Sequence, residues 1–265
     1  MLIIGHRGAA GLAPEHTFAS WDLALEAGAD YLEQDLQMTA DGVLVVLHDD
    51  SLDRTARGSG CRGAVRERAW AEIRDCDVGS WFNEAHPQLA RPEFAGQRIP
   101  TLDAVLERYA GRARFYIETK NPEAAPGMEE ALVRLLEARD LLPRQPGDAT
   151  VIIQSFSERS LLRVRELEPR LPLILLLGRR EFGWTIRRKL RRIAGWAAGI
   201  GPAKGDVDRK LLDAAHALGL VVHPWTVNDP VDLEKLANFG VDGVFTDFPD
   251  RAAAVRGGPG GNFGA

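Results

Sequence analysis

The 265-residue sequence contains little cysteine, methionine, tyrosine and lysine, and it has no long apolar run. The longest such run, 171–177, is interrupted by Pro172 and is far shorter than the roughly 20 residues that span a bilayer, so we expect no stable membrane insertion. The 33 basic and 38 acidic side chains leave a net charge of −5, which predicts no nucleic-acid partner. The start of the sequence does not resemble a secretory leader, and we expect a soluble, cytoplasmic protein.

Cysteine occurs only as Cys61 and Cys76, both in a loop-rich segment. Their spacing matches no metal-binding or redox motif. A disulfide is the alternative, but two free thiols in a reducing compartment are favoured by the pattern. We therefore expect unpaired cysteines without a chemical role.

The remaining composition, 45% hydrophobic and 27% charged, is that of an ordinary globular protein. Short apolar runs alternate with helical stretches such as 17–27, 101–109 and 208–218, which is typical of repeated βα units and a parallel sheet. Eight such units predict an α/β fold, a closed (β/α)₈ TIM barrel. The expected strands are 2–4, 31–36, 114–118, 150–154, 173–177, 198–201, 221–225 and 243–246.

One segment breaks this alternation. An extra strand, 43–47, follows the hairpin signal Asp41-Gly42, and no simple βα unit can be found in 53–100. This stretch is too long for a structureless loop, so we expect a small insertion after the second βα unit, packed beside the barrel mouth, with a core formed by its tryptophans, Trp70 and Trp81. The barrel domain is predicted to cover 1–255, and the glycine-rich end, 256–265, is expected to be a disordered tail.

Carboxylates occur at alternate positions of two expected strands. Glu33 and Asp35 share one face of the second strand, and Glu118 and Lys120 repeat the spacing on the next. Ionised carboxylates that share a buried site need a cation nearby. One Mg²⁺ or Ca²⁺, held by Glu33, Asp35 and Glu118, would meet that need; the alternative is that Glu118 and Lys120 only form salt bridges with Asp35 and Glu33.

Two histidines directly follow strands. His6 and Arg7 come after the first strand, and His48 comes after the extra strand. Reactive groups gather at the carboxyl ends of barrel strands. Two imidazoles there could act as the general acid and base of a phosphoryl-ester cleavage, with Arg7 and Lys120 neutralising the phosphate oxygens.

The sequence resembles the glycerophosphodiester phosphodiesterases, in an ordered set of short motifs that extends from residue 2 to about 250. Each motif is weak by itself, but their order is highly specific. The motifs are His6-Arg7-Gly8, Pro14-Glu15-His16-Thr17, Glu33-Gln34-Asp35, 41–49, Leu52-Asp53-Arg54-Thr55, Gly79-Ser80-Trp81-Phe82, Ile99-Pro100-Thr101-Leu102, Glu118-Thr119-Lys120, Gln154-Ser155-Phe156, Trp225-Thr226-Val227-Asn228, 240–243 and Thr246-Asp247.

The resemblance implies metal-dependent hydrolysis of a glycerophosphodiester to glycerol 3-phosphate and an alcohol. It implies His6 and His48 as the acid/base pair, without saying which is which, and it leaves open whether water or a glycerol hydroxyl attacks first. The remaining implied roles are metal binding by Glu33, Asp35 and Glu118, and substrate binding by Arg7, Lys120, Glu15 and Trp225. Asp247 is left undecided.

One departure from the family stands at His16, where the family usually has asparagine. A neutral imidazole could keep one of the amide's hydrogen bonds, and we assign it no catalytic role.

Two other functions remain open at this point. A lysophospholipase D or a related phospholipase-type enzyme would use the same site on a larger lipid, and a barrel that binds phosphodiesters without cleaving them would need no catalysis. Basic residues at 179–180 and 187–192 surround Trp184, Ile186 and Ile193, which favours a solvated helix face over weak contact with a lipid surface. Neither the headgroup nor the oligomeric state can be read from the sequence.

Overall fold

Eight parallel strands form a nearly closed barrel in the computed structural model, which describes residues 1–145, 147–178 and 186–257. Each strand pairs with its neighbour in the order β8-β7-β6-β5-β4-β2-β1-β9. Between β8 and β9 the contact is made by single backbone hydrogen bonds beside the strand ends, from Asp242 N to Val222 O at 3.2 Å and from Phe245 N to Pro224 O at 3.0 Å. The predicted fold is confirmed. The barrel strands are β1 (Leu2–Gly5), β2 (Tyr31–Met38), β4 (Arg114–Thr119), β5 (Val151–Ser155), β6 (Leu173–Leu177), β7 (Gly199–Pro202), β8 (Val221–Val222) and β9 (Gly243–Thr246).

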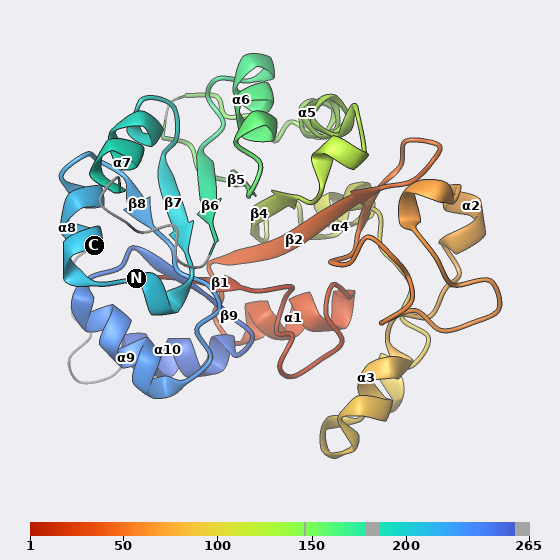
Figure 1. Cartoon of the computed structure of the whole chain (residues 1–265). Coiled ribbons are helices and arrows are strands. Elements are labelled where there is room, and N and C mark those ends of the chain that lie inside the picture. The colour runs from red at the N-terminus through yellow and green to blue at the C-terminus, as the bar shows by residue number, and fades with distance from the viewer. Residues whose placement is uncertain (146, 179–185, 258–265) are drawn as a thin grey trace.

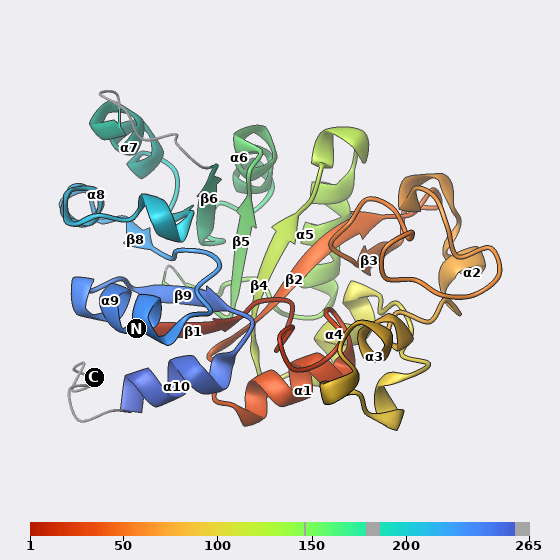
Figure 2. The same ribbon diagram turned by 60° about the horizontal axis from the view of Figure 1, so that its bottom comes forward.

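Helices surround this barrel on its outer side (Figures 1 and 2). Their ends carry the expected punctuation: the Thr17 side chain caps α1 by accepting from Ser20 N, and Gly240 ends α9 with a left-handed φ of 84°. The helices are α1 (Phe18–Glu26), α4 (Leu102–Tyr109), α5 (Met128–Ala138), α6 (Glu158–Leu167), α7 (Ile186–Ala194), α8 (Arg209–His216), α9 (Pro230–Phe239) and α10 (Pro249–Gly257). Short 3₁₀ turns, 122–124 and 204–206, lie in two of the connections.

Strand alternation separates two apolar cores. Leu32 and Leu36 of β2 belong to the large core between the strands and the helices. Tyr31 belongs to a second core, which fills the barrel interior. Since Glu33 and Asp35 follow Tyr31 at intervals of two residues, they lie on the interior side of β2, above that core. The interior core consists of Ile4, Tyr31, Tyr116, Ile152, Ile174 and Phe245.

The predicted insertion is present and extends to one side of the barrel (Figure 1). It begins with β3 (Leu44–Val46), which pairs antiparallel with β2 as expected from the hairpin signal, and continues through α2 (Trp70–Ile73) and α3 (Ser80–Ala85). Three 3₁₀ turns, 65–67, 87–89 and 92–94, complete it. It has its own core, made of Val45, Leu47, Leu52, Ala56, Cys61, Val65, Ile73, Cys76, Val78 and Ile99. The expected tryptophan core is wrong, because Trp70 is only partly buried against this core and Trp81 packs against a separate cluster with Phe82 and Phe94.

The cysteines correct one expectation. Cys61 and Cys76 form a disulfide, with their Cα atoms 5.7 Å apart, so the prediction of two free thiols is wrong. Spacing in the sequence could not reveal this pairing, because the folding of the insertion core is what brings both side chains into contact. The disulfide closes a loop within the insertion and covalently links two segments of that small core.

Several ends and faces differ from the expectations. β8 ends at Val222, short of the predicted 225, and α10 continues to Gly257, two residues beyond the predicted domain end. Residues 258–265 of the expected tail, and 179–185 of the basic stretch, lie outside the described residues. In α7, Leu190 and Ile193 are buried in the large core, so the apolar face of this basic helix packs on the barrel. Among the described residues, no helix is both long and apolar enough to cross a membrane.

Candidate active site

Three carboxylates lie at one pocket at the carboxyl ends of β2 and β4. The strand register places Asp35 beside Glu118, and Glu33 lies one step deeper, beside Tyr116. All three carboxylates are almost fully buried. The pocket has a volume of about 150 Å³ and also receives both predicted catalytic histidines and both predicted phosphate-binding cations. Its lining consists of His6, Arg7, Glu33, Asp35, His48, Glu118, Lys120, Gln154, Phe156, Leu176, Trp225, Thr226 and Phe245.

Burial and mutual repulsion set the charges of these carboxylates. Burial, together with the Asp35 charge, raises the pKa of Glu118 to about 8 and that of Glu33 well above its ordinary value. Burial also opposes ionisation of Asp35, but the Lys120 charge and the hydrogen bond with His16 hold the pKa of Asp35 well below its ordinary value. At neutral pH the metal-free cluster therefore keeps protons that a divalent cation would displace.

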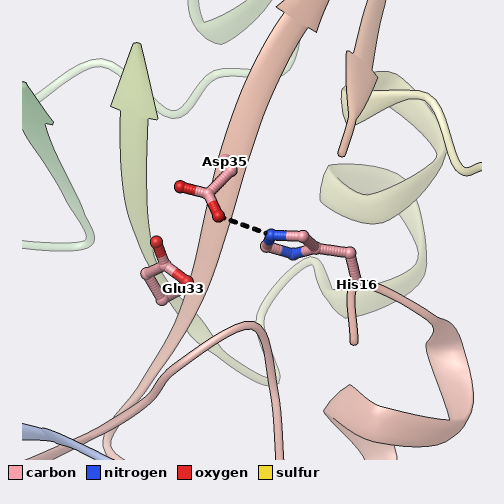
Figure 3. A group of neighbouring side chains, drawn as sticks. All are labelled: His16, Glu33 and Asp35. Atoms are coloured by element: carbon pink, nitrogen blue, oxygen red, sulfur yellow. Dashed lines mark hydrogen bonds and ion pairs between the residues drawn. The ribbon is translucent and has the colours of Figure 1, made fainter. Parts of the chain in front are cut away.

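His16 contacts this cluster directly. Its Nε2 lies 2.8 Å from Asp35 Oδ2, with both side chains buried (Figure 3). The contact crosses from the loop before α1 to β2, so the His16 ring faces Glu33 and Asp35 rather than solvent. Burial lowers the pKa of His16, so the ring is neutral at neutral pH.

These side chains fit a divalent cation. One ligand atom each from His16, Glu33 and Asp35 lies within 4.8 Å of the others. The amide oxygen of Gln154 is buried without a hydrogen-bond partner while its nitrogen donates to Glu33 Oε1 at 3.3 Å, so an unsatisfied oxygen also lies beside the cluster. Glu118, the third expected ligand, lines the same pocket, and its Oε1 lies 3.1 Å from Lys120 Nζ. His16 was not among the ligands expected from the sequence.

His6 is oriented by the barrel. Its Nδ1 lies 2.6 Å from Asp247 Oδ1, and the other Asp247 oxygen accepts from Asn228 Nδ2 at 2.6 Å. Burial alone would raise the pKa of Asp247, but the hydrogen bond and charge of His6 keep that pKa below its ordinary value. Since an ionised carboxylate only accepts, the His6 proton sits on Nδ1 and Nε2 remains for a ligand.

His48 has the same arrangement on the insertion side. Its Nδ1 lies 2.6 Å from Asp49 Oδ1, and Arg54 Nε donates to Asp49 Oδ2 at 2.6 Å. Burial lowers the pKa of His48 to about 4, so the ring is neutral at neutral pH. It can therefore accept a proton, again at Nε2.

The two pocket cations approach from opposite sides of Asp35. Arg7 Nε lies 3.4 Å from Asp35 Oδ2, and Lys120 Nζ lies 3.7 Å from Oδ1. Arg7 has a left-handed φ of 52°, and its backbone N–H donates to Glu33 Oε2 at 2.7 Å. A non-glycine residue in this conformation is strained, and here the hydrogen bond to Glu33 helps to fix it. Glu15, expected to position substrate or arginine, accepts from Arg7 Nη1 at 3.2 Å but is outside the pocket lining.

Aromatic rings form the remaining wall. Trp225 and Phe156 meet edge to face with centroids 5.6 Å apart, and the Trp225 Nε1 donates to Gly201 O at 2.8 Å. Phe156 is 49% exposed, unusually for its size. Trp225 was an expected substrate contact, whereas Phe156 stood in the sequence only as part of a motif.

The residues that support the two histidines and the carboxylates were not predicted from the sequence. Asp49, Arg54 and Gln154 belong to the family-like motifs but received no role, and the undecided Asp247 proves to hold His6. Asp49 could have been found, since it directly follows His48. Nothing in the sequence indicates that Asp247 lies beside a histidine 241 positions earlier.

Known proteins resemble this chain along nearly its whole length. The model of the glycerophosphoryl diester phosphodiesterase family matches residues 6–251. A glycerophosphodiester phosphodiesterase of Bacillus subtilis is 43% identical over 256 residues, which cover 97% of this chain and 86% of that protein. A second, from Caldanaerobacter subterraneus, is 35% identical, with 94% of this chain and 95% of that protein covered.

Solved structures show the same fold. A putative glycerophosphoryl diester phosphodiesterase from Silicibacter pomeroyi superposes with a TM-score of 0.82 at 30% identity, covering 96% of this chain and 92% of the other. An Oleispira antarctica phosphodiesterase, solved in complex with its product sn-glycerol-3-phosphate, also gives 0.82, at 28% identity with 96% of both chains covered.

Proposed function

Because the chain belongs to the glycerophosphoryl diester phosphodiesterase family, we propose that it hydrolyses glycerophosphodiesters to glycerol 3-phosphate and an alcohol. One observation carries this proposal: a single pocket of about 150 Å³ contains both histidines, both cations and all three carboxylates. The similar Oleispira structure, with glycerol 3-phosphate as its product, supports the same reaction. The charge distribution suits a diester that binds by its phosphate and develops negative charge as it is cleaved.

The two histidines divide the proton transfers. His48, neutral because its pKa is about 4, accepts the proton of the attacking hydroxyl, either of water or of the neighbouring glycerol carbon. His6, held through Nδ1 by Asp247, donates a proton from Nε2 to the oxygen of the departing alcohol as its bond to phosphorus breaks. Arg7 and Lys120 bind the non-bridging oxygens. ³¹P NMR during turnover identifies the attacking group, because only glycerol attack forms a cyclic phosphate.

A divalent cation completes the site in this proposal. Glu33, Asp35 and Glu118 would hold it, with His16 beside Asp35, and we propose Mg²⁺ or Ca²⁺ because the acidic donors are hard oxygens. Such an ion supplies Lewis-acid stabilisation of the phosphate charge. EDTA should abolish activity and added Mg²⁺ or Ca²⁺ should restore it. Full activity in the chelator would refute this part of the proposal.

Small diesters are the proposed substrates. A pocket of about 150 Å³ suits a glycerophosphate group better than a lipid chain, although the exposed Phe156 could touch a longer group outside it. A coupled assay for glycerol 3-phosphate with glycerophosphocholine, glycerophosphoethanolamine and glycerophosphoglycerol tests the function. Lysophosphatidylcholine is included as the contrasting substrate. If it is the only substrate cleaved, and choline is released from it, the protein is a lysophospholipase D. If no substrate gives a product, the protein is a non-catalytic barrel.

The sequence predicts a cytoplasmic protein, and the Cys61–Cys76 disulfide bears on that prediction. Disulfides persist mainly in oxidising compartments, so the Cys61–Cys76 bond argues against a reducing one. Alkylation of free thiols at the moment of cell lysis decides between them. Reduced, labelled cysteines would support the cytoplasm, and protected cysteines would exclude it.

A further inference from the structure

Arg54 connects the two sides of the active site without entering it. Its guanidinium makes four hydrogen bonds to two carboxylates that belong to different parts of the chain. Toward Glu15 the distances are 2.7 and 3.0 Å from Nη2 and Nη1. Toward Asp49 they are 2.6 Å from Nε and 3.2 Å from Nη2. Such forked pairs fix direction as well as distance.

Each carboxylate bound by Arg54 also binds a group that lines the pocket. Glu15 Oε1 accepts from Arg7, the proposed phosphate cation, and Asp49 Oδ1 contacts His48 Nδ1, on the proposed general base. A continuous chain of charged contacts therefore runs from Arg7 through Glu15, Arg54 and Asp49 to His48. Glu15, Arg54 and Asp49 are all outside the pocket lining.

The same residue links the loop after β1 to the insertion, beside an apolar cluster in which Ala13 of that loop packs with Phe82 and Phe94 of the insertion. Glu15 lies in the loop after β1, whereas Arg54 follows Leu52 and precedes Ala56, both buried in the insertion core with the Cys61–Cys76 disulfide. The Arg54 guanidinium also lies 5.7 Å from the centre of the Trp81 ring, a further contact within the insertion. Arg54 is thus held by the insertion, and its ion pair with Glu15 connects that segment to the loop after β1.

We propose that Arg54 is a positioning residue, which sets the separation and orientation of Arg7 and His48 by bridging Glu15 and Asp49. The proposal rests on the proposed function, since it takes His48 as the base and Arg7 as the phosphate ligand. An exposed ion pair ordinarily contributes little to stability. Because Arg54 is 42% exposed, we expect it to affect the geometry of the pocket, and therefore turnover, more than the stability of the fold. A shift of about 1 Å in a reacting group can cost up to roughly 100-fold in rate.

Arg54→Met tests this with Arg98→Met as its matched control. Arg98 also lies in the insertion and forms an exposed ion pair, 2.7 Å from Asp75, that does not reach the pocket. We expect Arg54→Met to lower kcat roughly 10- to 100-fold and to raise the KM for glycerophosphocholine, with a melting temperature close to that of the native enzyme. Arg98→Met should leave both kinetic constants unchanged. Arg54→Lys keeps the charge without the fork and should recover little of the loss.

A cycle of variants separates positioning from a general loss of structure. Among the described contacts, Glu15 and Asp49 meet only through Arg54, so the effects of Glu15→Gln and Asp49→Asn on kcat should be less than multiplicative in the native background. In the Arg54→Met background they should multiply. Multiplicative effects in both backgrounds would overturn the proposal.

Further outcomes distinguish a failure of the positioning proposal from a failure of the proposed function. If His48→Ala is inactive while Arg54→Met and Arg54→Lys match the native kcat and KM, the function stands and Arg54 has no positioning role. If His48→Ala turns over normally, His48 is not the base and the positioning proposal loses its premise, whereas the proposed function fails only if the native protein releases no product from any of the diesters. If Arg54→Met does not fold, Arg54→Lys is measured instead. A native kcat in Arg54→Lys would overturn the proposal that the forked guanidinium positions Arg7 and His48.

Discussion

The two histidines of the pocket are held by different means, one by the barrel and the other by the insertion. His6 is supported by Asp247 and the neutral amide of Asn228, which follow strands or lie between them on the barrel. His48 is supported by Asp49 and the charged Arg54, all within or next to the insertion. The barrel side is thus built into the sheet, whereas the insertion side depends on ion pairs and on a small disulfide-bonded core. The acid should accordingly be fixed more rigidly than the base.

The largest effect is expected from removing either imidazole, and the substrate tells the two apart. His6→Ala and His48→Ala should each lower turnover of glycerophosphocholine by roughly 100-fold or more while the melting temperature stays unchanged. A 4-nitrophenyl diester of glycerol phosphate has a leaving group that needs no proton. His6→Ala should regain most of its rate on that substrate, and His48→Ala should not. Rescue of His48→Ala instead would reverse the assigned roles.

The next largest effect on kcat is expected from removing the carboxylate of Asp247, which holds His6 on the barrel side. Asp247→Asn replaces the ionised partner of His6 Nδ1 with an amide that can also donate, so the ring can take the wrong tautomer. We expect kcat to fall at least about 10-fold with little change in KM. Asn228→Asp serves as a comparison, since it places a second negative charge beside Asp247. An unchanged kcat in Asp247→Asn would mean that the His6–Asp247 contact plays no part in turnover.

Removing the disulfide should affect only the insertion side of the site, and we expect a smaller fall in kcat than from removing a histidine or Asp247. Cys61→Ala combined with Cys76→Ala frees a short loop, whose closure is worth about 3 kcal/mol in chain-entropy models. We expect faster amide hydrogen exchange in the insertion and a kcat lowered by a few fold, with exchange in β1, β2 and β9 unchanged. Uniformly faster exchange in the barrel strands would show that the two units do not behave separately.

The smallest expected effect concerns the barrel interior and its response to acid. Burial lowers the pKa of His223 to about 4, below its ordinary 6.5, so the unfolded chain binds the proton more readily. The contribution of His223 to stability is complete above pH 6.5 and is lost as the pH falls toward 4, at most about 3 kcal/mol. His223→Leu should flatten the fall of the melting temperature over this range. A slope equal to that of the native protein would assign the acid sensitivity to other groups.

Features that arise from local pattern could be predicted from the sequence. Apolar runs predicted the barrel strands, and the spacing of Glu33 and Asp35 correctly placed both on one face of their strand, which proves to be the interior one. Contacts that only the closed barrel creates, such as the one between His6 and Asp247, could not be predicted. The Cys61–Cys76 bond and the bridge made by Arg54 escaped for the same reason, because each depends on how an irregular insertion folds onto itself and onto the loop after β1.

β2 shows how little tolerance this architecture has for a change in chain length. Tyr31, Glu33 and Asp35 form one inward row solely because strand side chains alternate, and Asp35 is also paired in register with Glu118 of β4. Deleting or adding one residue between Asp30 and Glu33 would turn the acidic row toward the outer helices and direct Gln34 and one leucine to the pocket. Loops around this barrel can lengthen freely during divergence, but this strand cannot gain or lose a single residue without losing the site.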